Sequence, residues 1–370
     1  MCLKQTNKPN ILELHYHPES KVADKLNERS KLSQLIFTPS IWLRGGNLQT
    51  LINPLKGIYL KAFMPYQYKR EIFTFKDGGT IALDWHETIP EGNATPGQRQ
   101  RPIVAIMPGL ASDSNDIYIV NLVREGQRNG YHPIVINYRA ASGVPLTNEV
   151  WYSQGSTGDL MEPLQHIYTR YCKDRDLFLI GNSVGAQLSG SLMGKVGDKT
   201  FIKACALVQP PMNLRKCGDN MASTNFGLYS RFLALGLKIK LRPHLAKLRP
   251  IYKEKYDLDI DEALASSKTI MELDQNFTVK VFGFGTIDNY LDKVSCCNYL
   301  STISNPTFIL MAKDDPIVGR DTIEYDLCKA NQTIILGVTD SGGHLGYFES
   351  IMGTEQWFTR PVYEFLNCYK

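Results

Sequence analysis

The sequence lacks the features that mark several large classes of protein. It contains no run of about 18 apolar residues, so no membrane-spanning helix is expected. Its N-terminal segment has no apolar core of the kind found in secretory signals, and position 2 is cysteine, not the glycine that N-myristoylation requires. Fixed-period repeats and low-complexity tracts are also missing. We therefore expect an intracellular protein, either cytoplasmic or peripherally bound to a membrane.

Patterns typical of metal sites and disulfide frameworks are absent as well. The eight cysteines are spread over the whole chain, and none belongs to a C-x-x-C pair or to a cysteine–histidine cluster with zinc spacing. Cys296 and Cys297 are adjacent, which is a poor geometry for an ordinary disulfide. The sequence thus predicts reduced thiols, no metal and no cofactor.

The composition is that of an ordinary globular protein with an uneven charge distribution. Of the 370 residues, 43% are hydrophobic and 21% charged, which excludes a wholly disordered chain, collagen and a coiled coil. The net charge of +4 is too small to indicate nucleic-acid binding. Residues 215–256, however, hold ten Lys or Arg and two acids. This segment therefore carries +8, and the rest of the chain carries −4.

Apolar runs alternate with amphipathic stretches along most of the chain. Two alternating segments, 71–76 and 80–85, flank Asp77-Gly78-Gly79 and predict a β-hairpin. Continuous apolar strands follow, separated by helical segments; the strands are expected at 103–107, 133–137, 177–180, 204–208, 307–311 and 333–336. Such strands indicate a mostly parallel sheet with helices on both faces, which is an α/β architecture.

Two parts of the chain depart from this alternation. Residues 1–35 are polar and weakly patterned, so we expect an N-terminal arm followed by one large domain over 36–370. A stretch at about 213–300 interrupts the alternation and is too long for a structureless loop. We interpret it as an inserted helical lid.

A candidate nucleophile lies at the end of one expected strand. The sequence Gly181-Asn182-Ser183-Val184-Gly185 falls between a strand and a helix, as in the G-x-S-x-G elbow of serine hydrolases. Ser183 in such a turn takes a strained backbone, and Gly181 and Gly185 avoid clashes with the neighbouring strand and helix. The helix N-terminus that follows offers N–H groups to an oxyanion.

Ser183 requires an acid and a histidine further along the chain. Asp314 and Asp315 follow an expected strand, and His344 lies in a glycine-flanked loop after the last strand. We favour Asp315 because Pro316 directly after it holds it extended at the strand end. The expected catalytic residues are Ser183, Asp315 and His344, and the other histidines (His15, His17, His86, His132, His166 and His244) are interpreted as structural or surface residues.

Two backbone N–H groups should form the oxyanion hole. One belongs to Val184, directly after the nucleophile, and the other to the loop after strand 103–107, with Leu110 as the preferred residue. In this mechanism His344 takes the proton of Ser183, which attacks an acyl carbonyl. Water or an alcohol then resolves the acyl-enzyme.

The sequence at this point resembles the YheT-like branch of the α/β-hydrolases, which includes ABHD1/ABHD3-type lipases and yeast medium-chain ester synthases. The resemblance runs from about residue 37 to the end. It is carried by residues 37–51 (FTPSIWLRGGNLQTL, with the pair Gln49-Thr50), 77–85 (DGGTIALDW), 108–110 (PGL), 282–290 (FGFGTIDNY) and 312–318 (AKDDPIV). It implies the α/β-hydrolase fold, the same three catalytic residues, and medium-chain acyl esters or phospholipids as substrates.

Three functions remain open. The favoured one is a serine hydrolase of lipid acyl esters. A second is a non-catalytic subunit that keeps the fold for docking in a larger assembly, where a protein partner holds the polar arm, which would otherwise fray. A third is acyl transfer to an alcohol by the same residues. The basic segment 215–256 would suit peripheral contact with anionic lipid headgroups, and no nucleic-acid partner is expected.

Overall fold

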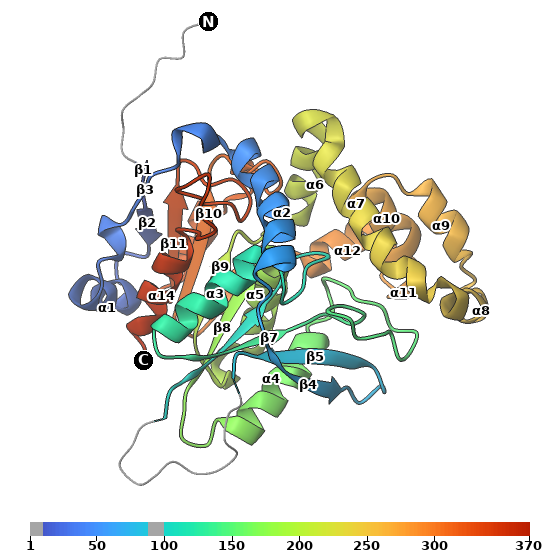
Figure 1. The fold of residues 1–370 in the computed structure, drawn as a ribbon, viewed down its shortest axis with the longest axis horizontal. Coiled ribbons are helices and arrows are strands. Elements are labelled where there is room, and N and C mark those ends of the chain that lie inside the picture. Colours follow the sequence, from blue (N-terminus) through green and yellow to red (C-terminus); the bar gives the residue numbers. More distant parts are fainter. Residues whose placement is uncertain (1–9, 88–99) are drawn as a thin grey trace, which may run out of the picture.

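A nine-stranded sheet crosses the computed structural model, which describes residues 10–87 and 100–370 (Figure 1). The strands from β11 to β7 are parallel, whereas β2 at one edge and the β5–β4 hairpin at the other are antiparallel. In spatial order they are β2 (Glu13–Tyr16), β11 (Ile334–Thr339), β10 (Thr307–Ala312), β9 (Ile202–Val208), β8 (Leu177–Asn182), β6 (Ile103–Met107), β7 (His132–Ile136), β5 (Thr80–Trp85) and β4 (Lys69–Thr74). The predicted mostly parallel sheet with an antiparallel hairpin is confirmed.

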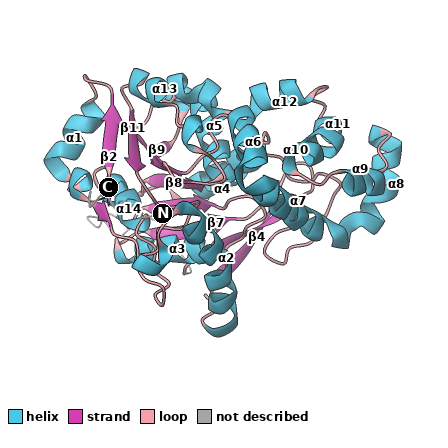
Figure 2. Cartoon of the chain, turned by 90° about the horizontal axis from the view of Figure 1, so that it is seen from above, coloured by secondary structure: helices cyan, strands magenta, loops and turns pink. Residues whose placement is uncertain are grey.

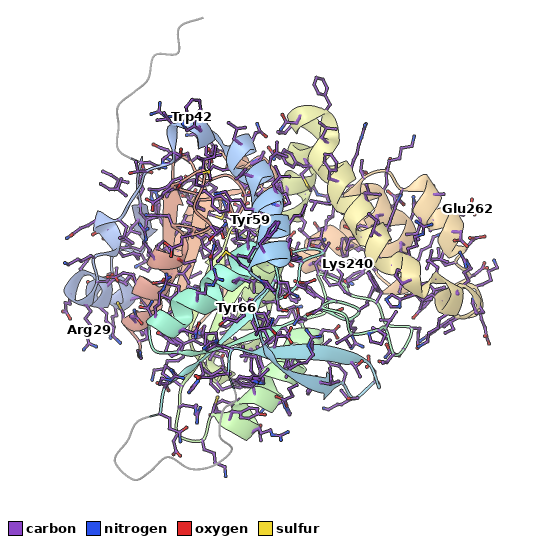
Figure 3. The ribbon with its side chains drawn as sticks, in the orientation of Figure 1. Arg29, Trp42, Tyr59, Tyr66, Lys240 and Glu262 are labelled. Carbon is purple, nitrogen blue, oxygen red and sulfur yellow. The ribbon has the colours of Figure 1, made fainter. Side chains whose placement is uncertain are left out.

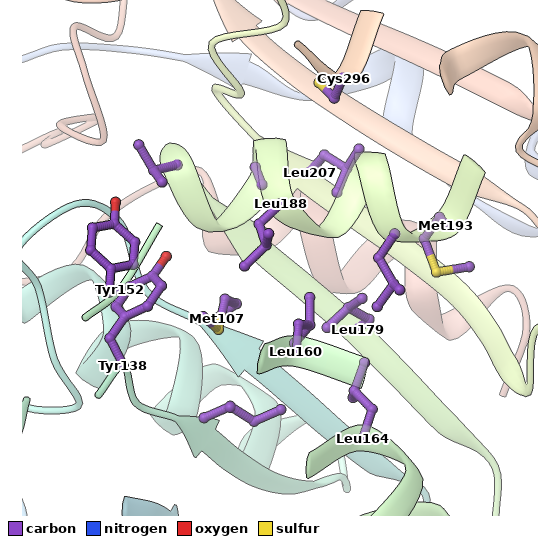
Figure 4. Close-up of a cluster of buried hydrophobic side chains, with 14 of the residues drawn as sticks. Met107, Tyr138, Tyr152, Leu160, Leu164, Leu179, Leu188, Met193, Leu207 and Cys296 are labelled. Carbon is purple, nitrogen blue, oxygen red and sulfur yellow. The ribbon is translucent and has the colours of Figure 1, made fainter. Parts of the chain in front are cut away.

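Helices cover both faces of the sheet, because successive side chains of each buried strand point to opposite faces. In β6, Val104 and Ile106 pack toward α1 (Lys21–Arg29), α3 (Ile117–Arg128) and α14 (Thr359–Asn367). The alternate side chains pack toward α4 (Gly158–Tyr171), α5 (Val184–Val196) and α13 (Tyr325–Ala330). Figure 4 shows part of this second core, where Leu160 and Leu188 lie over the sheet residue Leu179.

Residues 10–35 lie against the sheet and do not extend away from it. β1 (Asn10–Ile11) pairs with β3 (Ile36–Phe37), and β2 pairs with β11. Without β2, β11 would be the edge strand and would present unpaired N–H and C=O groups, which β2 satisfies. The boundary expected at residue 35 therefore does not separate an arm from the main domain over residues 10–35; residues 1–9 lie outside the described part.

One long helix has no counterpart among the elements expected from the sequence. α2 (Gly46–Phe63) contains Pro54 and carries no side-chain cap at its N-terminus, so the usual start signal is missing. Further along the chain, a 3₁₀ turn at Arg320–Thr322 precedes the short helix α13.

The segment between β9 and β10 is helical, and it lies beside the sheet at the right of Figure 1. Its helices are α6 (Leu214–Ser223), α7 (Leu228–Leu241), α8 (Leu245–Tyr256), α9 (Ile260–Ser266), α10 (Ile270–Leu273), α11 (Val279–Val281) and α12 (Ile287–Val294). Its function as a lid stays a prediction. Over residues 10–87 and 100–370, no helix combines the length and apolarity needed to cross a bilayer.

Candidate active site

Ser183 occupies a sharp turn between β8 and α5. Its backbone angles, φ 53° and ψ −122°, lie in a region that residues other than glycine rarely adopt. The flanking glycines allow this turn, because a Cβ at Gly181 would lie 2.6 Å from the Cα of Ala186. A Cβ at Gly185 would overlap the carbonyl oxygen of Pro108. The turn thus presents the Ser183 side chain at the carboxyl end of β8.

The structure brings the three expected catalytic side chains together. His344 Nε2 lies 2.8 Å from Ser183 Oγ, and His344 Nδ1 lies 2.7 Å from Asp315 Oδ2. All three residues are buried. The other carboxylate oxygen, Asp315 Oδ1, accepts hydrogen bonds from the N–H groups of Ile317 (2.8 Å) and Val318 (3.0 Å). The carboxylate is therefore held in one orientation, with Oδ2 facing the imidazole.

The neighbouring Asp314 has a different position. Its Oδ1 accepts the N–H groups of Gly342 and Gly343, both at 2.9 Å, directly before His344. Burial raises the pKa of this carboxyl group to about 6, and the nearby Asp315 adds to the shift. Asp314 therefore contacts the backbone of the loop that carries His344 (residues 340–348, the histidine loop), whereas Asp315 contacts the imidazole.

Thr50 on α2 is a second support of the histidine loop. The sequence indicates this residue only as part of the Gln49-Thr50 pair of the family motif. Its hydroxyl accepts the N–H of His344 at 2.8 Å and donates to the carbonyl oxygen of Gly46 at 2.7 Å. The adjacent Gln49 bonds both the N–H and the C=O of Phe348, at 2.8 and 3.0 Å. The Gln49-Thr50 pair thus ties α2 to this loop at both His344 and Phe348.

Gln209, at the end of β9, is a support that the sequence did not indicate. Its side-chain amide donates to the carbonyl oxygen of Gly343 and accepts the N–H of Leu345, on either side of His344. Its own backbone has a φ of 48°. No local signal marks this residue, because its partners lie in a distant part of the chain and meet it only through the order of the strands.

The two N–H groups expected at the oxyanion hole, those of Leu110 and Val184, belong to residues that line the same cavity as Ser183. Neither has a hydrogen-bond acceptor among the described residues. The Gly109 backbone comes so close that a Cβ there would lie 3.2 Å from the Cβ of Ser183. Tyr118 fixes this loop by accepting the Gly109 N–H at 2.8 Å, and burial raises the pKa of its hydroxyl well above the usual value.

A cavity of about 710 Å³ opens at Ser183. α2 forms one wall, and α6, α7 and α10 form the opposite wall, with mainly aliphatic and aromatic side chains. No lysine or arginine of the described residues lines it. Its size is in the usual range for small-molecule sites, and an apolar group is the chemistry that its walls accept.

The chain is similar to several known hydrolases, although no protein-family model matches it. It is 27% identical to human phospholipase ABHD3, with 89% of this chain and 77% of that protein covered. It is 27% identical to medium-chain fatty acid ethyl ester synthase/esterase 2 of Saccharomyces cerevisiae, with 92% of this chain and 85% of that protein covered. A solved structure of an esterase from Pyrobaculum calidifontis superposes with a TM-score of 0.51 at 14% identity, covering 85% of this chain and 90% of that one.

The chain has the α/β-hydrolase fold and is similar to the ABHD3-type enzymes. The resemblance seen in the sequence is therefore confirmed, and so is the expected fold, for which the Pyrobaculum esterase is an independent match. The names of the relatives also bear out the expected class of enzyme, a carboxylic ester hydrolase.

Proposed function

We propose that this α/β-hydrolase cleaves lipid acyl esters through an acyl-enzyme formed on Ser183. The observation that carries the proposal is the continuous hydrogen-bond path from Asp315 through His344 to Ser183, with distances of 2.7 and 2.8 Å. These distances allow proton transfer without further movement of the three side chains. The names of the relatives, which include a phospholipase, support a lipid ester as the substrate.

The proposed reaction begins with transfer of the Ser183 hydroxyl proton to Nε2 of His344 as Oγ attacks the ester carbonyl carbon. The carboxylate of Asp315 stabilises the imidazolium, and the N–H groups of Val184 and Leu110 donate to the oxyanion. His344 then protonates the departing alcohol as the carbon–oxygen bond breaks. Water, deprotonated by His344, attacks the acyl-enzyme, which releases the fatty acid and restores Ser183.

The cavity supports an uncharged acyl chain as the group bound beside Ser183. Its walls are largely apolar, and no cation of the described residues faces it to bind a phosphate. In this proposal the acyl chain lies between α2 and α7, while a charged headgroup remains outside the cavity. The length of the acyl chain can be measured with p-nitrophenyl esters of increasing chain length.

A fluorophosphonate probe tests whether the chain is a catalyst or a docking subunit. Labelling of the wild type that is lost in Ser183→Ala supports the proposal. Ser112→Ala is the matched control, because Ser112 lines the same cavity and lies outside the proposed catalytic residues. A folded wild type that does not react with the probe would favour the docking role.

Acyl transfer to an alcohol is the second candidate, because one relative is named as an ethyl ester synthase as well as an esterase. The same acyl-enzyme serves both reactions, and the acceptor alone differs. Analysis of the products in the presence of ethanol separates them: ethyl ester accumulates if ethanol competes with water, and only free acid accumulates if it does not.

A further inference from the structure

Two helices on either side of the cavity expose apolar side chains to solvent. More than half of the large apolar side chains that are exposed in the described residues belong to α2, to α7 and to the turn before α7. Along each helix most of them recur at intervals of three or four residues, so each helix carries one apolar ridge. The ridge of α2 consists of Leu48, Leu51, Leu55, Ile58, Tyr59 and Phe63, and that of α7 consists of Phe226, Leu228, Phe232, Leu235 and Ile239.

The two ridges are connected across the cavity. Near one end, the Asn47 side chain accepts hydrogen bonds from Tyr229 and Asn225, both at 2.8 Å. Near the other end, Asp113 lies 4.0 Å from Lys61 of α2 and 3.7 Å from Lys240 of α7. Figures 1 and 2 show the two helices beside one another, and Tyr59 and Lys240 are labelled on them in Figure 3.

Three residues show where the cavity opens. Leu51 and Leu55 of α2 and Phe232 of α7 line the cavity and are also 49%, 61% and 62% exposed. A side chain can line the cavity and also be exposed to solvent only at the cavity mouth. The mouth therefore opens between the two ridges, and an acyl chain entering it passes along apolar side chains from outside to Ser183.

The turn before α7 presents its apolar side chain at a cost in backbone strain. Asn225, Phe226 and Gly227 have successive φ values of 48°, 56° and 73°, and a left-handed conformation is unfavourable for a residue as bulky as Phe226. The ring of Phe226 is 91% exposed. No contact within the described residues explains an aromatic ring held outward in this way.

The charges on these helices fit a lipid surface, but they are not the main source of attraction. α2 and α7 contain no acidic residue and five cations. In the wider basic segment 215–256, six of the ten cations are already paired with carboxylates. These pairs are Arg215–Asp288, Lys216–Glu324, Lys240–Asp113, Arg249–Asp261, Lys253–Asp257 and Lys255–Glu149. The formal +8 of this segment therefore overstates the charge available to headgroups.

We propose that the ridges of α2 and α7 insert into a lipid–water interface, so that the cavity mouth opens onto the acyl region of the membrane. Exposed apolar surface of this extent is typical of interaction sites, and helices with apolar residues outward and cations without acids are typical of interfacial helices. The inference rests on the proposed lipid ester hydrolysis, because a lipid substrate explains why the ridges surround the cavity. It assigns the contact to apolar insertion, with charge in a lesser role.

Flotation with vesicles of phosphatidylcholine alone tests this proposal. Because these vesicles carry no net charge, we expect wild-type binding that persists at about 0.5 M salt, where exposed charges are strongly screened. Ile58→Ser with Phe63→Ser on α2, and Leu235→Ser with Ile239→Ser on α7, should each lower binding by roughly tenfold or more. None of these four side chains lines the cavity.

The matched control is Ile72→Ser with Leu327→Ser, two exposed apolar residues on β4 and α13. This variant should bind vesicles as the wild type does. All variants should hydrolyse a short, water-soluble p-nitrophenyl ester at the wild-type rate, which shows that they are folded and tests the proposed function separately.

Three outcomes would overturn the inference. Binding only to vesicles that contain an anionic lipid, and lost in salt, would assign the contact to the basic segment. Self-association that the ridge variants abolish, without vesicle binding, would assign the ridges to a second copy of this chain. An equal loss of binding in the control variant would show that the ridges have no special role. An inactive wild type that still binds vesicles would instead refute the proposed function alone.

Discussion

Replacing Asp315 by asparagine tests the charge of this residue, because the structure dictates how the new amide must face. Asp315 Oδ1 accepts two backbone N–H groups, those of Ile317 and Val318, while Oδ2 faces His344 Nδ1. In the variant only the amide oxygen can accept the two N–H groups, so the NH₂ group must point at Nδ1. The proton of the imidazole then moves to Nε2, which can no longer accept the proton of Ser183.

The expected loss in kcat follows from the free energy needed to reverse the new amide group. If the amide were reversed, its oxygen would face Nδ1 and the correct tautomer would return. The two hydrogen bonds from the backbone N–H groups would then be lost, and the NH₂ group would face those two N–H donors, at a cost of roughly 3 kcal/mol. At about 1.4 kcal/mol per factor of ten, only about 1% of the molecules would then be competent. We therefore expect kcat to fall at least ~100-fold, and toward ~10⁴-fold as the imidazolium loses its counter-charge.

The assay is steady-state hydrolysis of a soluble p-nitrophenyl ester, with thermal unfolding to confirm that the variant is folded. Asp314→Asn is the matched control, since it makes the same chemical change one residue away and keeps the oxygen that bonds Gly342 and Gly343. It should lose less than roughly tenfold in kcat. A folded Asp315→Asn variant with more than about a tenth of wild-type kcat would refute the reasoning, as would equal losses in the two variants.

Three further predictions concern the residues that shape the site. Thr50→Val leaves the N–H of His344 buried without a partner; kcat/KM should fall roughly tenfold and stability by about 1–3 kcal/mol in denaturant titration, and Thr50→Ser should restore both. Gly185→Ala forces a Cβ onto a backbone carbonyl and should cost more than about 4 kcal/mol, whereas Gly57→Ala, which meets nothing within 4 Å, should fold normally. Because burial raises the pKa of Asp314 from 3.8 to about 6, the folded state keeps a proton that the unfolded state releases. The free energy of unfolding should therefore fall by up to about 3 kcal/mol as pH rises from about 4 to 6, and an Asp314→Asn variant with the same pH slope as the wild type would contradict this.

Local features of the site were readable from the sequence because a few neighbouring residues determine them. The turn at Ser183 depends on its own flanking glycines, and the strand that leads into it depends on a continuous apolar run. Asp315 and His344 were predictable because each lies in the loop after a strand that the same pattern indicates. The ends of parallel strands meet at one edge of a sheet, so the order of these residues along the chain was enough to place them together.

The remaining features depend on contacts between distant segments. The edge position of β2 required a partner strand that lies near the other end of the chain, and the support of His344 by Gln209 depended on which strands are neighbours in the sheet. The apolar residues of α2 were visible in the sequence, but periodicity shows only that a side chain shares a face with others. Whether that face is covered is decided by what packs against it, and in this protein nothing within the described residues covers the ridges beside the cavity mouth. The sequence thus determined the chemistry expected at Ser183, and the tertiary structure decided how the histidine loop is held and which surface surrounds the entrance to it.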